Sequence, residues 1–161
     1  MIIEFQAFQD DNKVYVIKEL AFVSTYRYNR NLYFFKPPMS LKQLSKEAQD
    51  GVRWCTKYYH GISWDYGDVE YKDLHNILHH HTQYYKVLAT KGLEKAKLLA
   101  TLLQRNVINL DEVVGGKLRD LPPSQHVCVH RGNCAMDNAI RLLRVVKLNL
   151  ELVLARSAFC P

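Results

Sequence analysis

The chain has 161 residues, of which 22 are Lys or Arg and 16 are Asp or Glu, giving a formal charge of +6. With 48% apolar and 24% charged residues it has the composition of one folded domain, which excludes a disordered or fibrous chain. No apolar run approaches the roughly 20 residues needed to cross a bilayer, and Glu4 stands where a secretory signal would be basic. We therefore expect a cytoplasmic or nuclear protein with reduced cysteines, neither secreted nor in contact with a membrane.

The first 36 residues predict a three-stranded antiparallel meander. Residues 3–7, 14–22 and 31–36 alternate apolar with polar side chains and are rich in β-branched and aromatic types. The polar residues 10–12 suit the first turn, and two prolines end the third strand.

Helical spacing of apolar residues predicts four helices after the meander. They cover residues 45–58, 71–78 and 93–103 and the stretch from Cys134 to about Leu150. Short apolar runs at 84–89 and 107–110 predict two more strands, joined by a right-handed parallel crossover.

This order predicts a single α/β domain over residues 1–161, divided into the meander (1–36), a helical and crossover part (40–110), and a loop with the last helix (120–155). It is the order of a ribonuclease H-like domain, in which three antiparallel strands and then two parallel strands form a mixed sheet flanked by helices. A flavodoxin-like or another mixed sheet would accommodate part of the same pattern.

The segment from Val16 to Val23 resembles the second strand of DEDDh exonucleases. Members of that family hold two divalent cations with four carboxylates. Here Glu4-Phe5-Gln6 replaces the Asp-x-Glu of the first strand, and Asn133 and Asn138 fall where the family has its last His and Asp. At most one or two of the four acids survive, so the usual two-metal nuclease is not expected.

Cys128, His130 and Cys134 lie within seven residues, a set of thiolates and imidazole that favours tetrahedral Zn²⁺. With the Cys134-Ala135 pair before the last helix, this set resembles the Maelstrom domain, a ribonuclease H-like domain that carries a Glu-Cys-His-Cys zinc site. The resemblance implies Glu19 as the fourth ligand. The spacing departs from the family's Cys-x-x-His by one residue, and His126 is an alternative to His130. Without zinc, these thiols would be small core residues and Glu19 an exposed strand residue.

The remaining cysteines and histidines have plainer readings. Cys55 and Cys160 are expected to be small buried side chains. The run His79–His81 cannot form one tetrahedral face, since consecutive helical residues point about 100° apart. It is predicted to be a solvated helix end, although His75 and His79 are spaced to bind adventitious metal.

Aromatic and basic residues alternate over residues 26–33, at the second hairpin, and further basic residues lie on or beside two helices. This pattern suits stacking of unpaired bases and neutralisation of phosphates. The candidate nucleic-acid contacts are Tyr26, Arg27, Tyr28, Arg30, Lys91, Lys95, Arg131 and Arg144. The alternative is an ordinary hairpin tip and solvated helix faces.

The preferred hypothesis is a catalytically degenerate nuclease fold, stabilised by Zn²⁺, that binds single-stranded RNA. The Maelstrom resemblance implies a place in small-RNA silencing of transposons, with silencing-pathway proteins as partners. One alternative is a residual or rewired ribonuclease that uses Glu4, Glu19 and Asp137. A second is an interaction scaffold encoded by a virus or mobile element. Oligomeric state and RNA preference are not predicted.

Overall fold

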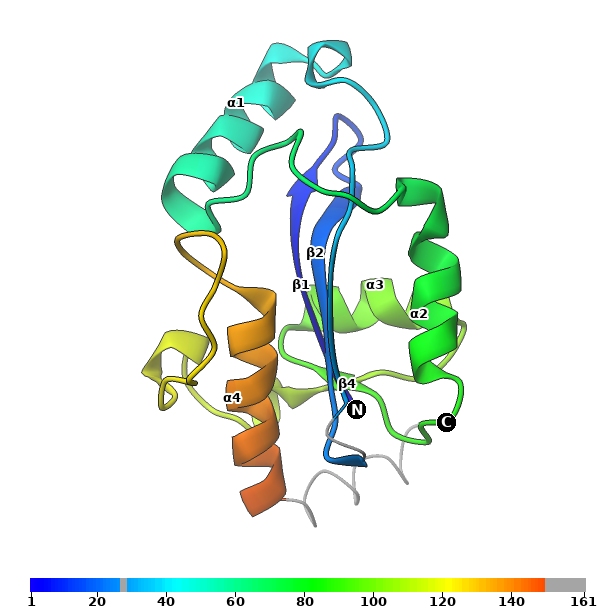
Figure 1. Ribbon diagram of the computed structural model, residues 1–161, viewed down its shortest axis with the longest axis vertical. Coiled ribbons are helices and arrows are strands. Elements are labelled where there is room, and N and C mark those ends of the chain that lie inside the picture. Colours follow the sequence, from blue (N-terminus) through cyan, green and yellow to red (C-terminus); the bar gives the residue numbers. More distant parts are fainter. Residues whose placement is uncertain (27–28, 150–161) are drawn as a thin grey trace.

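A five-stranded mixed sheet forms the centre of the protein in this computed structural model, which describes residues 1–26 and 29–149 (Figure 1). The strand order is β3-β2-β1-β4-β5. The strands are β1 (Ile2–Gln9), β2 (Tyr15–Val23), β3 (Arg30–Phe34), β4 (Ala89–Thr90) and β5 (Ile108–Asn109). The first three are antiparallel neighbours, while β4 and β5 run parallel to β1. The predicted α/β class is confirmed, and the sheet order is consistent with a ribonuclease H-like fold.

Four α-helices accompany the sheet in the described residues. They are α1 (Lys46–Trp54), α2 (Leu74–Thr82), α3 (Leu93–Leu103) and α4 (Ala135–Leu148). Ser45 begins α1, where its hydroxyl accepts a hydrogen bond from the backbone N–H of Ala48. After α1 the chain continues as a π-helix, η3 (Cys55–Tyr59), before Gly61 turns it away. Short 3-10 turns occur at Leu41–Gln43, Tyr71–Asp73, Leu110–Glu112 and Leu118–Asp120. No helix in the described ranges is long and apolar enough to span a membrane.

The parallel strands are much shorter than predicted. The expected strand over 84–89 is reduced to β4 because the residues just after α2 are held in a turn instead. Arg105 donates hydrogen bonds to the carbonyl oxygens of Thr82 and Tyr85, and the Tyr85 N–H donates to Thr82. The predicted strand at 107–110 likewise ends early in a 3-10 turn, and the third strand stops at Phe34.

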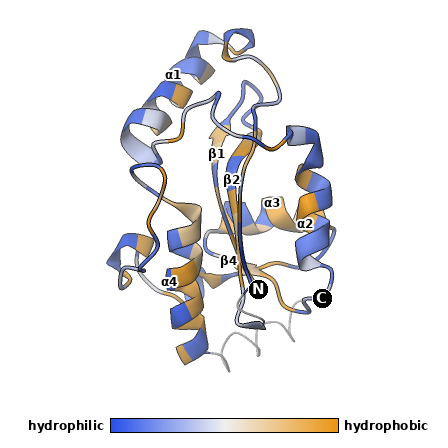
Figure 2. Cartoon of the chain, in the orientation of Figure 1, coloured by the Kyte–Doolittle hydropathy of each residue, from blue (hydrophilic) through white to orange (hydrophobic). Residues whose placement is uncertain are grey.

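Apolar side chains pack against both faces of the sheet. Figure 2 colours the hydrophobic residues of the strands and of α2, α3 and α4 orange. One core lies between the sheet and α4, and a second lies between the opposite face and helices α2 and α3. A smaller cluster of Phe8, Val16, Leu44, Val52 and Trp64 lies beneath α1.

A β-bulge fixes which side chains face α4. The β1–β2 register shifts between Gln6 and Ala7, so that Glu19 pairs with Gln6 while Ala7 pairs with Ile17. The extra residue, Lys18, is fully buried, and its ammonium group donates to the carbonyl oxygens of Phe35 and Tyr66.

The loop before α4 packs against the end of η3 through two glycines. A Cβ on Gly61 would lie 1.9 Å from the carbonyl oxygen of Arg131, and one on Gly132 would lie 2.6 Å from that of Tyr59. Both residues have positive φ angles, a conformation that favours glycine. The Asn133 N–H donates to the Tyr59 carbonyl at 3.0 Å, so the loop is fixed next to the sheet.

Candidate metal centre

Glu19 is a fully buried carboxylate on β2 that meets the start of α4. Its Oε1 lies 3.1 Å from His130 Nε2 and 3.5 Å from Cys134 Sγ, and its Oε2 accepts the Ala135 N–H at 2.9 Å. The candidate ligand atoms of Glu19, His130 and Cys134 all lie within 4.8 Å of one another. The structure therefore brings a strand residue 111 positions away in sequence next to the predicted His and Cys.

Cys134 also belongs to a second group of candidate ligands. His126, Cys128 and Cys134 place their ligand atoms within 4.8 Å of one another, and the two thiols are hydrogen-bonded. The two groups share Cys134 Sγ, so the other four candidate ligand atoms each lie within 4.8 Å of that sulfur. Both histidines that the sequence left as alternatives are thus near the thiols, but only His130 contacts Glu19.

The donor set and its spacing fit a metal ion. Ligand atoms in a tetrahedral site with bonds of about 2.0–2.3 Å lie roughly 3.3–3.8 Å apart. The distances from Glu19 to His130 and Cys134 are 3.1 and 3.5 Å, close to that range.

The site holds its protons tightly. Burial raises the pKa of Cys134 to about 11 and also raises that of Cys128. Burial alone would lower the pKa of His130, but hydrogen bonds to Cys134 and Glu19 and their charges raise it to about 10. A metal ion binds only the deprotonated thiols and imidazole, so it must displace these protons. Only a strongly bound cation can do so at neutral pH.

The acid on the first strand is compensated by a lysine. Glu4 is fully buried, and its Oε2 accepts a hydrogen bond from Lys95 Nζ at 2.6 Å. Its Oε1 accepts the Thr90 hydroxyl and the Lys91 N–H, each at 2.9 Å. An ammonium group and two neutral donors therefore surround the Glu4 carboxylate.

The other residues aligned with nuclease positions are neutral or paired. Asn138 is buried and donates to the Asn133 side chain at 3.1 Å, so the two amides bind each other. Asp137 forms an ion pair with Arg141 at 2.7 Å. Within residues 1–26 and 29–149, no candidate metal group combines Glu4, Glu19 and Asp137.

A second feature is a groove of about 820 Å³ between the second hairpin and the end of α2. It is lined by Tyr26, Asn29, Asn31, His80, His81, Tyr84, Tyr85 and Lys86. Tyr26 and Tyr84 are 63% and 85% exposed. His81 stacks on Phe22, with ring centroids 4.6 Å apart, and its Nε2 lies 2.7 Å from the Tyr33 hydroxyl. His79 and His80 are exposed, as expected of a solvated helix end, but His80 and the half-buried His81 also line the groove.

The predicted nucleic-acid contacts divide into exposed and engaged residues. Tyr26, Arg30 and Arg131 are exposed, while Arg27 and Tyr28 lie outside the described residues. Arg144 is also exposed, and it donates to the Pro123 carbonyl.

The two lysines of this set are bonded within the chain. Lys91 Nζ binds Asp111 and the Val114 carbonyl, and Lys95 Nζ binds Glu4. Cys55 is half-buried at the end of α1, and Cys160 lies outside the described residues.

Sequence reasoning missed the Glu4–Lys95 pair and the part of the groove contributed by Tyr84, Tyr85 and Lys86. The Tyr-Tyr-Lys run was a signal for the groove, because two adjacent aromatics and a cation resemble the hairpin pattern. For the ion pair the sequence carried no signal, since the partners are 91 residues apart.

Comparisons with protein-family models, with curated proteins and with solved structures find no match to this chain.

Proposed function

We propose that this protein is a non-hydrolytic nucleic-acid-binding module whose fold is stabilised by Zn²⁺ and which binds single-stranded RNA. The observation that carries the proposal is that Glu19, His130 and Cys134 lie together as candidate metal ligands. In addition, Lys95 binds Glu4, the acidic residue of the first strand. The Maelstrom resemblance implies these three ligands together with Cys128, and it is the basis for proposing a role in small-RNA silencing.

Zinc is the metal that this donor set favours. Two thiols and an imidazole are soft or borderline ligands, whereas Mg²⁺ and Mn²⁺ prefer carboxylates and water. Glu19, Cys128, His130 and Cys134 would hold the ion, and they would join β2 to the loop before α4. A closed four-ligand site of this kind supplies folding free energy rather than a reactive water.

Single-stranded RNA is the ligand that the groove favours. Exposed tyrosine rings stack on unpaired bases without regard to sequence, and Lys86 and Arg30 supply positive charge for phosphates. The side-chain amides of Asn29 and Asn31, which line the groove, carry both donors and acceptors for base edges. The net charge of +6 adds a general attraction for a polyanion.

Metal analysis of protein purified without chelator tests the zinc site. We expect one zinc per chain, and we expect Cys134→Ser to lose the zinc and to melt at a lower temperature. Cys55→Ser is the matched control, because this half-buried thiol lies outside both ligand groups and its loss should leave the zinc content unchanged. If the wild-type protein contains no zinc and Cys134→Ser melts at the same temperature as the wild type, the site is refuted.

Fluorescence anisotropy with a labelled single-stranded RNA tests the groove. We expect Tyr84→Ala to weaken binding by about fivefold to 100-fold, the usual effect of losing one stacking ring. Lys86→Ala should reduce the salt dependence of the affinity by about one counterion. Tyr58→Ala is the control, because Tyr58 is an exposed tyrosine on η3 that does not line the groove.

The same incubation tests whether the module is an enzyme. Intact RNA is the expected result. Cleavage that is abolished by Glu19→Ala would instead establish the ribonuclease alternative, and binding that is independent of ionic strength would exclude a phosphate-contacting groove.

A further inference from the structure

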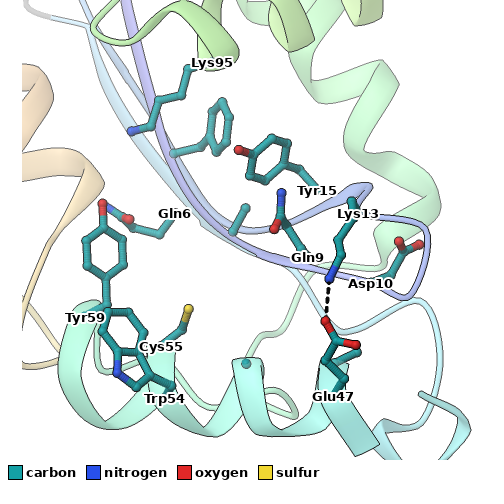
Figure 3. A pocket seen from close by; sticks show the side chains of 14 residues that line it. Gln6, Gln9, Asp10, Lys13, Tyr15, Glu47, Trp54, Cys55, Tyr59 and Lys95 are labelled. Carbon is teal, nitrogen blue, oxygen red and sulfur yellow. Dashed lines mark hydrogen bonds and ion pairs between the residues drawn. The ribbon is translucent and has the colours of Figure 1, made fainter. Parts of the chain in front are cut away.

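A cleft of about 550 Å³ lies between β1 and the helical segment of α1 and η3 (Figure 3). β1 contributes one wall, including Gln6 and Gln9, and Trp54 and Tyr59 line the opposite side. Lys95 reaches in from α3. The cleft shares no lining residue with the groove at Tyr26, and its volume is in the range of small-molecule sites, about 300–1,000 Å³.

Gln6 is an unusual lining residue because its amide is buried without a partner. The side chain is 2% exposed, and its Nε2 has no hydrogen-bond partner in the described part of the chain. Burying an unpaired amide destabilises a folded protein, and most buried polar groups are therefore paired. An NH₂ group that lines a cleft in this state is a donor available to a carbonyl oxygen of a ligand.

Trp54 and Tyr59 form an aromatic surface beside that donor. Their ring planes are within 21° of parallel, and their centroids lie 6.4 Å apart. Both are exposed, by 56% and 45%, which is uncommon for large aromatic residues that serve only the core. The π-helix widens the turn between them, and such insertions are frequent at functional sites.

The two lysines that line the cleft are already paired with carboxylates. Lys13 pairs with Glu47 at 3.0 Å, drawn as the dashed line in Figure 3, and Lys95 pairs with Glu4 at 2.6 Å. The site therefore offers no free cation to a phosphate. It suits a flat, uncharged ring that carries a carbonyl acceptor.

We propose that this cleft binds a single nucleobase, stacked on Trp54 and Tyr59, with Gln6 Nε2 donating to a ring carbonyl. Uracil, cytosine and guanine carry such an acceptor, whereas adenine does not, so adenine is expected to bind most weakly. The base comes either from a free nucleotide or from an unpaired position of an RNA strand. In the second case the inference deepens the proposed RNA-binding function and rests on it.

Tryptophan fluorescence reports this site directly. Trp64 is 2% exposed, so added ligand quenches mainly Trp54. We titrate the zinc-loaded full chain with each of the four nucleoside monophosphates and with an eight-nucleotide RNA. Saturable quenching is expected, weakest for adenosine monophosphate. Quenching by monophosphates alone identifies a free-nucleotide site that is independent of the RNA-binding groove, whereas quenching by RNA alone identifies a strand-borne base.

Two variants separate a binding role from a structural one. Gln6→Leu should weaken binding about fivefold to tenfold, yet leave the melting temperature unchanged or higher, because an unpaired amide is removed. Tyr59→Ala should weaken binding by about fivefold to 100-fold. Tyr58→Ala is the matched control, since it is exposed on the same π-helix but does not line the cleft. No saturable quenching by any probe, or wild-type affinity in both Gln6→Leu and Tyr59→Ala, overturns the proposal.

Discussion

Lys95→Met is the change that most directly examines the buried Glu4 carboxylate. Among the described residues, Lys95 supplies the one hydrogen bond to Glu4 Oε2, at 2.6 Å, whereas Thr90 and Lys91 bind Oε1. Methionine retains the aliphatic packing over Phe5, above which the ammonium group lies 5.1 Å from the ring centroid. The variant therefore removes mainly the positive charge.

The expected loss of stability is large for one side chain near the surface. Removing one partner of a fully buried ion pair costs about 3–5 kcal/mol. The Lys95 side chain is 23% exposed while that of Glu4 is fully buried, so water partly replaces the ammonium group and we expect about 2–3 kcal/mol. In the double variant Glu4→Gln/Lys95→Met the charge is gone from both sides, and its cost should be about 1 kcal/mol, below that of the single variant.

Urea unfolding followed by tryptophan fluorescence measures these free energies. Lys97→Met is the control on the same helix, because its pair with Glu94 is exposed and contributes about 0–1 kcal/mol. If Lys95→Met costs no more than Lys97→Met, or if the double variant is as unstable as the sum of its single variants, then Lys95 does not compensate Glu4. The interpretation of a nuclease acid neutralised by a lysine would then be wrong.

Three further predictions concern pH and the backbone. Zinc affinity, measured by chelator competition, should rise by about two to three orders of magnitude per pH unit between about pH 6 and 8, because His130, with a pKa of about 10, the Cys134 thiol, at about 11, and the Cys128 thiol, whose pKa burial raises, release two to three protons on binding. A pH-independent affinity contradicts these ligands. Burial lowers the pKa of Lys18 from 10.5 to about 8, so between these pH values the unfolded chain binds more protons than the folded one. The unfolding free energy of the wild type, measured by urea titration, should therefore rise with pH relative to that of Lys18→Met. Gly61→Ala should lower both the melting temperature and zinc retention, because its Cβ would meet backbone at 1.9 Å, whereas Gly51→Ala in α1 has open space and should gain about 0.5–1 kcal/mol in stability.

Local sequence patterns predicted the helices well. The helix over 93–103 and the one beginning after Cys134 occupy the predicted residues, and Ser45 begins α1. These elements depend on the spacing of apolar residues and on caps, which act within a few positions. The three-residue ligand cluster before α4 was equally visible, since its members lie within seven positions of one another.

The β1–β2 bulge is a feature that the alternation of apolar and polar residues did not predict. Glu19 was placed on a strand, but alternation alone left both faces open. The bulge at Lys18 shifts the register by one residue, so that Ile17 packs with Leu20 and Phe22 on the face away from α4, while Glu19 stays on the α4 face with Ala21 and Val23. The lengths of β4 and β5 escaped prediction for a similar reason, because Arg105 closes the turn after α2 from a distant position.

The sequence by itself determined the element order, the basic charge, and the presence of two thiols and an imidazole without the acids of a nuclease. Only the tertiary structure decided what surrounds each polar group. It places Lys95 on Glu4, joins His81 and Tyr84 to the groove at Tyr26, and leaves the Gln6 amide without a partner beside the second cleft. The physical reason is that burial and pairing depend on contacts between residues far apart in the chain, whereas periodicity records only neighbours.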